Sequence, residues 1–153
     1  MTREKMITNI LVAIDGSEHA LKAFDLACDF AVKYAAQITA IYVIENFEIP
    51  PELRHFAEVE HLSTDAYTLH YKVISENVTS KAKKLALEKG VSDLKTIILE
   101  GNPAHKILEF AENNAIDTII MGSRGLGTFK GFIQGSVSNK VSHLARCTCI
   151  SVK

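Results

Sequence analysis

Short apolar runs alternate with amphipathic stretches along almost the whole chain. Residues 7–14 are apolar and rich in branched side chains, and they run into Asp15-Gly16-Ser17. This pattern predicts a buried strand followed by a tight turn. By the same criterion, further strands are predicted at residues 38–44, 94–99, 118–121 and 149–152.

The stretches between the strands carry apolar residues at helical spacing. The first helix has its apolar stripe at Leu21, Phe24, Cys28, Ala31 and Ala35. Ser17 and Glu18 suit the N-terminal end of this helix. A second helix begins near Ser63 and stops at Gly90. Its stripe consists of Tyr67, Tyr71, Ile74, Val78, Ala82 and Leu85.

Two more helices follow in the second half of the chain. Asn102-Pro103 is a good helix start, with Asn as the cap and Pro at the first helical position. The buried face of that helix is expected at Ile107, Leu108 and Ala111. A last short helix is marked by Val137, Val141 and Leu144. Residues 45–62 contain Pro50-Pro51 and show no clear period, so we expect an irregular segment there.

Strands that alternate with helices favour parallel pairing, right-handed crossovers and helices on both faces of one sheet. The sequence therefore predicts an α/β fold with a doubly wound sheet, formed by one domain over residues 1–153. That length is sufficient to bury a core without disulfide bonds or metals.

Composition narrows the functional classes. The chain is 47% hydrophobic and 23% charged, with a formal net charge of −1, so no overall field would attract it to nucleic acid or to an anionic membrane. It has no run suited to a signal peptide or a membrane span, and its three cysteines argue against a disulfide framework. We expect a cytoplasmic protein.

Glycines concentrate after the fourth predicted strand, between Gly122 and Ser136, where a helix begins. In doubly wound folds ligands bind beyond the carboxyl ends of the strands. Glycines allow a close approach of the backbone, and the free N–H groups of a helix start favour an anion. Arg124, Lys130 and the hydroxyls of Ser136 and Ser138 add groups suited to a polyphosphate. We call residues 122–135 the phosphate loop.

Familiar nucleotide motifs do not fit this loop. A Walker A sequence requires Lys before Ser or Thr, but Gln134-Gly135-Ser136 lacks it. A dinucleotide fingerprint would need a third glycine where Lys130 stands, and the loop follows the wrong strand.

The spacing Gly-x2-Gly-x9-Gly-Ser, through Gly122, Gly125, Gly135 and Ser136, resembles the ATP-binding branch of the universal stress protein family. Residues 10–17, 100–103 and 117–125 also resemble that family, in order and at its spacing. The resemblance implies a five-stranded parallel sheet of order 3-2-1-4-5, of the adenine nucleotide alpha-hydrolase-like type, with four main helices. The switch point of this sheet, where the strand order reverses, would lie between the first and fourth strands.

The resemblance also implies a nucleotide site. Ala13, Ile14 and Asp15 would lie beside the adenosine, and the backbone of Val43 would contact the adenine. The ribose and phosphates would be lined by Met121, Gly122, Arg124 and Gly125. The phosphate tail would be held by Gly135, Ser136, Val137 and Ser138. The implied ligand is ATP, or ADP or AMP, with Mg²⁺ or Mn²⁺ bound through the phosphates. A homodimer through the C-terminal strand is implied as well, and an apolar edge strand favours such pairing.

Structural interpretations compete with some of these roles. Asp15 could cap the turn that follows it, the glycine loop could be a connection without a ligand, and Lys130 could be a solvated charge. The cysteines are interpreted as buried or half-buried, without a metal, and Tyr67 and Tyr71 as packing residues. The six histidines form no catalytic grouping in the sequence, and we assign no catalytic residue.

Three functions remain open. The first is an ATP-binding regulatory or stress-response protein with unidentified protein partners and at most slow hydrolysis. The second is a slow ATPase or an adenylate-handling enzyme that shares the fold. The third is a ligand-free dimeric interaction module, against which the complete glycine motif counts.

Overall fold

The computed structural model describes residues 7–45, 55, 58–60, 65–126 and 135–153. The described strands are β1 (Asn9–Ala13), β2 (Gln37–Ile44), β3 (Lys95–Glu100), β4 (Thr118–Gly122) and β5 (Thr148–Val152). The helices that connect them are α1 (Glu18–Tyr34), α3 (Asp65–Glu88), α4 (Pro103–Asn113) and α5 (Ser136–Leu144).

The strands form one parallel five-stranded sheet in the order β3-β2-β1-β4-β5. The central strand β1 pairs with β2 on one side and with β4 on the other, with Ile10 opposite both Ile38 and Thr118. After β1, the chain adds β2 and β3 on one side of the sheet and then β4 and β5 on the other side. The strand order therefore reverses between β1 and β4. The predicted fold class, strand order and switch point are confirmed.

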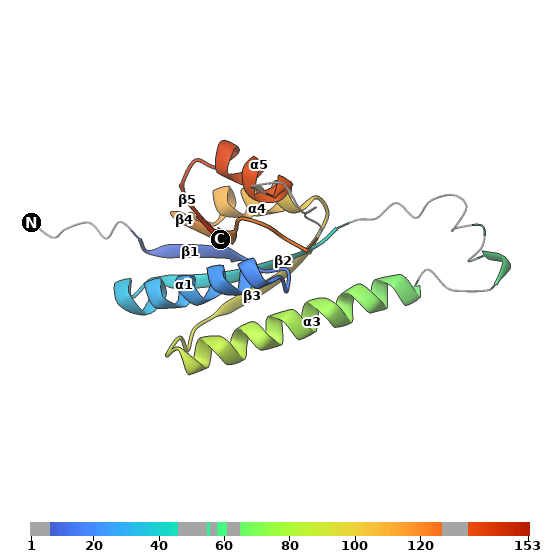
Figure 1. Cartoon of the computed structure of the whole chain (residues 1–153), viewed down its shortest axis with the longest axis horizontal. Coiled ribbons are helices and arrows are strands. Elements are labelled where there is room, and N and C mark those ends of the chain that lie inside the picture. The colour runs from blue at the N-terminus through green and yellow to red at the C-terminus, as the bar shows by residue number, and fades with distance from the viewer. Residues whose placement is uncertain (1–6, 46–54, 56–57, 61–64, 127–134) are drawn as a thin grey trace, which may run out of the picture.

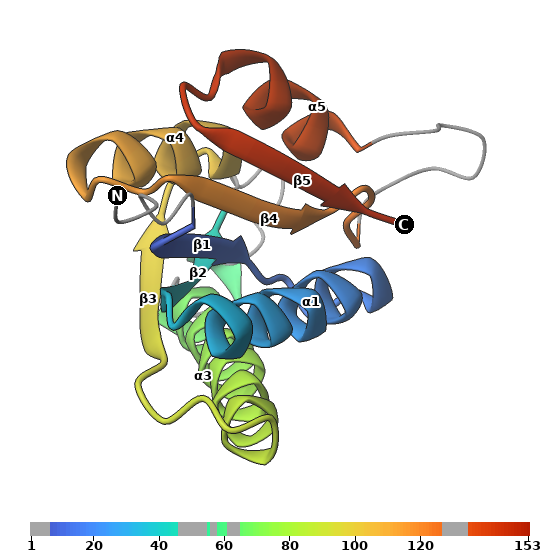
Figure 2. The ribbon, with the colours of Figure 1, turned by 90° about the vertical axis from the view of Figure 1, so that its left-hand side faces the viewer.

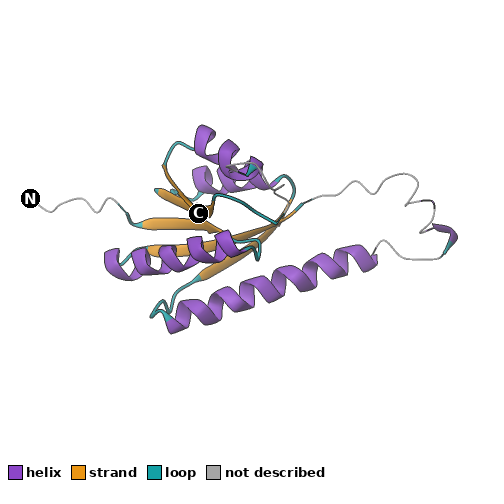
Figure 3. Ribbon diagram, in the orientation of Figure 1, coloured by secondary structure: helices purple, strands orange, loops and turns teal. Residues whose placement is uncertain are grey.

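Helices cover both faces of this sheet, as Figures 1 and 2 show. On one face, α1 and α3 pack against Ile10, Val12 and Ile120. On the other face, α4 and α5 pack against Leu11 and Ile119. Because alternate residues of a strand point to opposite faces, the continuous apolar runs of β1 and β4 supply both cores. Figure 3 shows the strands in orange between the two purple helical layers.

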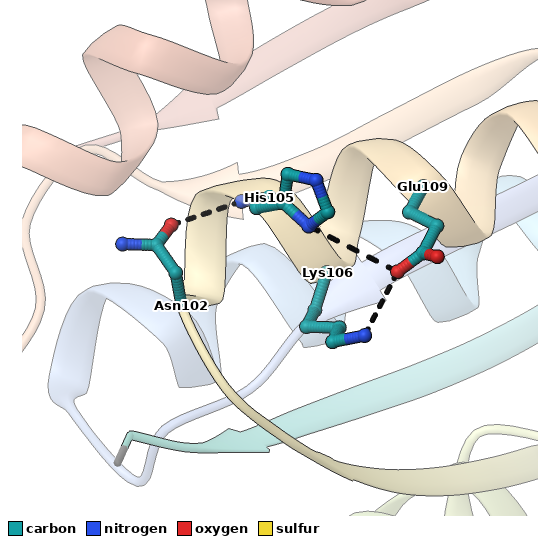
Figure 4. A network of polar contacts seen from close by, with 4 residues as sticks. All are labelled: Asn102, His105, Lys106 and Glu109. Carbon is teal, nitrogen blue, oxygen red and sulfur yellow. Dashed lines mark hydrogen bonds and ion pairs between the residues drawn. The ribbon is translucent and has the colours of Figure 1, made fainter. Parts of the chain in front are cut away.

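Two helix starts carry the caps that the sequence predicts. The Ser17 hydroxyl accepts a hydrogen bond from the Ala20 N–H at 3.2 Å, and Asn102 Oδ1 accepts one from the His105 N–H at 3.0 Å. In the next turn of α4, the Glu109 carboxylate contacts Lys106 Nζ at 2.9 Å (Figure 4). The Asn102 cap gives a partner to a backbone N–H that would otherwise have none at the start of α4.

The structure differs from the sequence predictions in a few places. Leu21, which belongs to the apolar stripe predicted for α1, is 48% exposed. Leu108 is only partly buried beside Ile107 and Ala111. Residues 45–62 were predicted to be irregular, and most of them lie outside the described residues. The side chain of Tyr67 also lies outside the described part of the structure.

Asp117 connects the amino-terminal ends of β1 and β4. Its Oδ2 accepts hydrogen bonds from the Thr8 and Asn9 N–H groups, both at 2.8 Å, and from the Thr8 hydroxyl at 2.6 Å. Its Oδ1 accepts one from the Thr118 hydroxyl at 2.8 Å. Burial alone would raise the pKa of Asp117, but these hydrogen bonds outweigh burial and lower it.

The three cysteines are free thiols that pack in the interior, as predicted. Cys28 is fully buried between α1 and the sheet, and burial raises its pKa to about 11. Cys147 and Cys149 are half-buried against the α4–α5 core, and burial raises both of their pKa values, that of Cys149 to about 11. None of the described helices is long and apolar enough to cross a lipid bilayer.

Candidate functional site

A cavity of about 500 Å³ opens at the carboxyl ends of the strands, where the chain changes direction between β1 and β4. All the residues that the sequence predicts for a nucleotide site line it. They are Ala13, Ile14, Asp15, Val43, Met121, Gly122, Arg124, Gly125, Gly135, Ser136, Val137 and Ser138. The fold therefore brings together segments that lie far apart in the chain.

One wall of the cavity is apolar. It is formed by Val43 and Met121 from the strand ends and by Pro103 and Ile107 from the first turns of α4. The cap at Asn102 places that first turn beside the strand ends. Such a wall suits the flat face of an aromatic base or another apolar group.

Two tyrosines also line the cavity, Tyr42 from β2 and Tyr71 from α3. Burial is the main cause that raises the pKa of Tyr42, and the nearby Asp15 and Tyr71 raise it further. Tyr42 therefore remains a neutral hydrogen-bonding group at physiological pH. The apolar stripe of α3 predicted a packing role for Tyr71, and in the structure this residue also forms part of the cavity.

Asp15 uses both carboxylate oxygens to fix the backbone around the cavity. Oδ1 accepts a hydrogen bond from the Ser17 N–H at 2.8 Å, and Oδ2 accepts one from the Leu126 N–H at 3.3 Å. The turn-capping interpretation of Asp15 is therefore confirmed. Because the same carboxylate lines the cavity and holds the start of the phosphate loop, a ligand role is compatible with the cap.

Two glycines of the motif are required by close approaches. A Cβ on Gly122 would lie 2.7 Å from the carbonyl carbon of His19 in the first turn of α1. A Cβ on Gly125 would lie 2.7 Å from Asp15 Oδ2. Real Cβ contacts are essentially never this short, so the absence of a side chain at both positions lets β4 and the loop approach β1 and α1.

The N-terminus of α5 forms the polar end of the cavity. Gly135 is its N-cap residue, with φ −69° and ψ 154°, and supplies no side-chain cap. The first N–H groups of a helix have no acceptor within the helix, and they carry the positive end of its dipole. Ser136, Val137 and Ser138 at this helix start line the cavity, and so does Arg124, which carries a positive charge. This end of the cavity suits an anion.

The hydroxyl of Ser138 has a structural partner. It is buried and lies 3.0 Å from both the Ser123 and the Gly135 carbonyl oxygens. The hydroxyl donates its one hydrogen to these two acceptors. Any contribution of Ser138 to anion binding would therefore come from its backbone N–H. The hydroxyl of Ser136 is exposed, and no such bond fixes it among the described residues.

Sequence reasoning missed several residues of the cavity wall. They are Ala20, Ile41, Tyr42, Ile44, Glu45, Tyr71, Pro103, Ile107 and Leu126. Ile44 ends β2 and Glu45 follows it, so the rule that places ligands at strand ends could have found both. Tyr71 gives no such signal, because a helical stripe does not distinguish a cavity wall from a core.

The described residues contain no group of three or more His, Cys, Asp or Glu side chains arranged to hold a metal ion. Lys130, for which a solvated loop charge was predicted, lies outside the described residues.

The fold and the cavity define a doubly wound α/β protein with a cavity at the carboxyl ends of its strands, between β1 and β4. The model of the universal stress protein family matches residues 6–153. Universal stress protein YxiE of Bacillus subtilis is 35% identical over 149 residues, which are 97% of this chain and 100% of that protein. The chain therefore belongs to the universal stress protein family, as the glycine motif indicated.

Solved structures agree with this assignment. Universal stress protein UspA from Lactobacillus plantarum has a TM-score of 0.77 at 30% identity, and the alignment covers 95% of this chain and 97% of that one. A universal stress protein in complex with cAMP shares the fold, with a TM-score of 0.68 at 21% identity, over 95% of this chain and 96% of that chain.

Proposed function

We propose that this chain binds an adenine nucleotide, ATP in the first instance, in the cavity at the carboxyl ends of β1 and β4. The observation that supports this most strongly is the convergence of all the predicted contact residues on that one cavity. A regulatory role in the stress response follows from the family, with nucleotide occupancy setting which protein partners are bound.

The chemistry of the cavity matches the parts of such a ligand. The apolar wall of Val43, Met121 and Ile107 would take the adenine, with the Val43 backbone supplying polar contacts. Asp15 and Gly122 would lie beside the ribose. The N–H groups at the start of α5 would hold the phosphates, because they combine free donors with the positive end of the helix dipole.

A related structure supports the ligand class. One universal stress protein of the same fold was solved in complex with cAMP, which is an adenine nucleotide. In our proposal ATP, ADP or AMP occupies the cavity of this chain, with Mg²⁺ or Mn²⁺ on the phosphates. Hydrolysis of ATP would be slow at most, because the sequence shows no evident general base and no nucleophile paired with one.

We further propose a cytoplasmic homodimer that pairs through β5. This strand ends the sheet on one side, and its only strand partner among the described residues is β4. Exposed N–H and C=O groups on an edge strand can pair with the same strand of a second copy. Size-exclusion chromatography with light scattering tests this proposal, and a monomer at high concentration would contradict it.

Identification of a copurified ligand tests the nucleotide proposal. The freshly purified protein is denatured, and any released small molecule is identified by mass spectrometry. The emptied protein is then titrated with ATP and magnesium by calorimetry, beside the variants Asp15→Ala and Gly135→Val. We expect binding by the wild type and weaker binding by both variants.

The two variants disturb different parts of the site. Asp15→Ala removes the carboxylate from the β1 end, whereas Gly135→Val places a branched side chain where a Cβ would already lie 3.3 Å from the Ser123 carbonyl oxygen. Lys140→Ala serves as the control, because Lys140 is exposed in the middle of α5 and does not line the cavity. Absence of both a released nucleotide and titratable binding by the wild type would refute the proposal.

A further inference from the structure

We propose that His19 and Ser123 form a positioning pair that sets the affinity of the site for phosphate groups. The inference rests on the proposed nucleotide function and adds two residues that do not line the cavity. Neither side chain would touch the ligand. Their effect would pass through the backbone that carries the N–H donors of α5.

Ser123 is the point at which both ends of the phosphate loop meet. Its carbonyl oxygen accepts hydrogen bonds from the Gly135 N–H at 2.6 Å and from the Ser138 hydroxyl at 3.0 Å. Its own N–H donates to the Val152 carbonyl oxygen at 2.7 Å. The residue therefore connects β4, β5 and the start of α5, and it is only 3% exposed.

The side chain of Ser123 is held by α1. His19 Nδ1 lies 3.0 Å from Ser123 Oγ, at hydrogen-bonding distance, in the first turn of the helix that follows β1. Either tautomer of His19 allows the bond, since a hydroxyl can donate or accept. The contact spans 104 positions in sequence, and it is supported by the close packing of Gly122 on the His19 backbone.

The pair acts on one end of the cavity. Through the Ser123 carbonyl it fixes Gly135 and Ser138, which begin the helix that would hold the phosphates. The apolar wall of Val43 and Ile107 belongs to β2 and α4, which make none of these bonds. Loss of the pair should therefore weaken binding of the phosphates and leave binding of the adenosine part nearly unchanged.

The test uses substitutions that remove or restore the single hydrogen bond. His19→Ala and Ser123→Ala each delete one partner, and the double variant deletes both. In His19→Asn the amide can place a polar atom close to the position of Nδ1, so this variant should retain the bond. His105→Ala is the matched control, because His105 is an exposed histidine in the first turn of α4 that does not line the cavity (Figure 4).

Calorimetric titrations with ATP and with adenosine separate the two ends of the site. We expect His19→Ala to weaken ATP binding about five- to tenfold, the range that corresponds to the loss of one hydrogen bond, and to change adenosine binding less than about twofold. His19→Asn should recover most of the ATP affinity. The double variant should be no weaker than either single variant, because both remove the same interaction.

Hydrogen exchange gives a readout that does not depend on the ligand. The Gly135 amide should exchange faster in His19→Ala than in the wild type and in His105→Ala, while amides of the central strand β1 stay protected. Equal ATP affinities and equal Gly135 exchange in wild type and His19→Ala would overturn the positioning role and leave the nucleotide proposal intact. A wild type that binds no adenine nucleotide would overturn both.

Discussion

Gly122 at the end of β4 packs directly on the backbone of His19 in the first turn of α1. A Cβ at position 122 would lie 2.7 Å from the His19 carbonyl carbon and 2.8 Å from the Ala20 nitrogen. Both atoms belong to the helix backbone, which cannot move without shifting the whole first turn. The first glycine of the motif therefore serves the packing of α1 on β4.

Gly122→Ala should consequently destabilise the fold. Forcing a methyl group against backbone costs about 2–3 kcal/mol, which corresponds to a fall in Tm of roughly 5–10 °C for a chain of this size. Gly90→Ala is the control, because Gly90 has φ +86° but open space around its missing Cβ. It should cost only about 1 kcal/mol, through backbone strain. Thermal unfolding followed by circular dichroism measures both, and equal losses would contradict the packing role of Gly122.

Gly125→Ala should have a different effect. Its Cβ would meet Asp15 Oδ2 at 2.7 Å, the end of a side chain that can rotate away. We expect little loss of stability, below about 1 kcal/mol, but displacement of the carboxylate from the cavity and weaker ATP binding. In an Asp15→Ala background the added methyl group should have almost no further effect on ATP affinity. A full further loss in that background would show that Gly125 acts by another route.

Asp117→Asn should lower stability more at neutral pH than in acid. The pKa of Asp117 is lowered in the folded chain, so its stabilising contribution is complete above the usual pKa of an aspartate. That contribution is lost as the pH falls through the lowered pKa. The partly exposed carboxylate suggests a difference of about 1 kcal/mol at pH 7.

Urea unfolding of wild type and Asp117→Asn at pH 7 and near pH 3 measures this dependence. The exposed Asp93→Asn serves as the control, since Asp93 lies in the connection between α3 and β3. The same stability gap at both pH values would show that the hydrogen bonds to Thr8 and Asn9 do not depend on the charge of Asp117.

The cysteines should react slowly with alkylating reagents in the folded protein. Burial raises the pKa values of Cys28 and Cys149 from 9.0 to about 11, so the thiolate form is about a hundredfold rarer than in an ordinary cysteine. Iodoacetamide labelling followed by mass spectrometry at pH 8 should modify these two thiols far faster after addition of urea. Rapid labelling of Cys28 in the native protein would contradict its place in the core.

The sequence predicted the fold well, because each element carries local signals. Asn102 and Pro103 mark the start of α4 by themselves, and the apolar runs of β1 and β4 identify strands covered on both faces. The exposure of Leu21 was not predicted, because periodicity assigns a residue to a helix face without showing how far the sheet extends beneath that face.

Parts of the site could not be predicted from local patterns. The contact between His19 and Ser123 joins residues far apart in sequence, and nothing near either residue signals it. The hydroxyl of Ser138 was expected to face a ligand, but it donates to a backbone carbonyl that only the fold brings close. Tyr71 was given a packing role, because its position in the apolar stripe of α3 does not reveal the neighbouring cavity.

An NMR titration of the uniformly ¹⁵N-labelled wild type with ATP and magnesium tests the central claim most directly. We predict saturable shifts of the amides of Gly122, Gly125 and Ser136–Ser138, together with Val43 at the end of β2. The amides of Ala115 and Cys147 lie at the opposite ends of the strands and should not shift. No saturable shifts, or shifts confined to residues outside the cavity, would contradict the proposal that the carboxyl ends of β1 and β4 form an adenine nucleotide site.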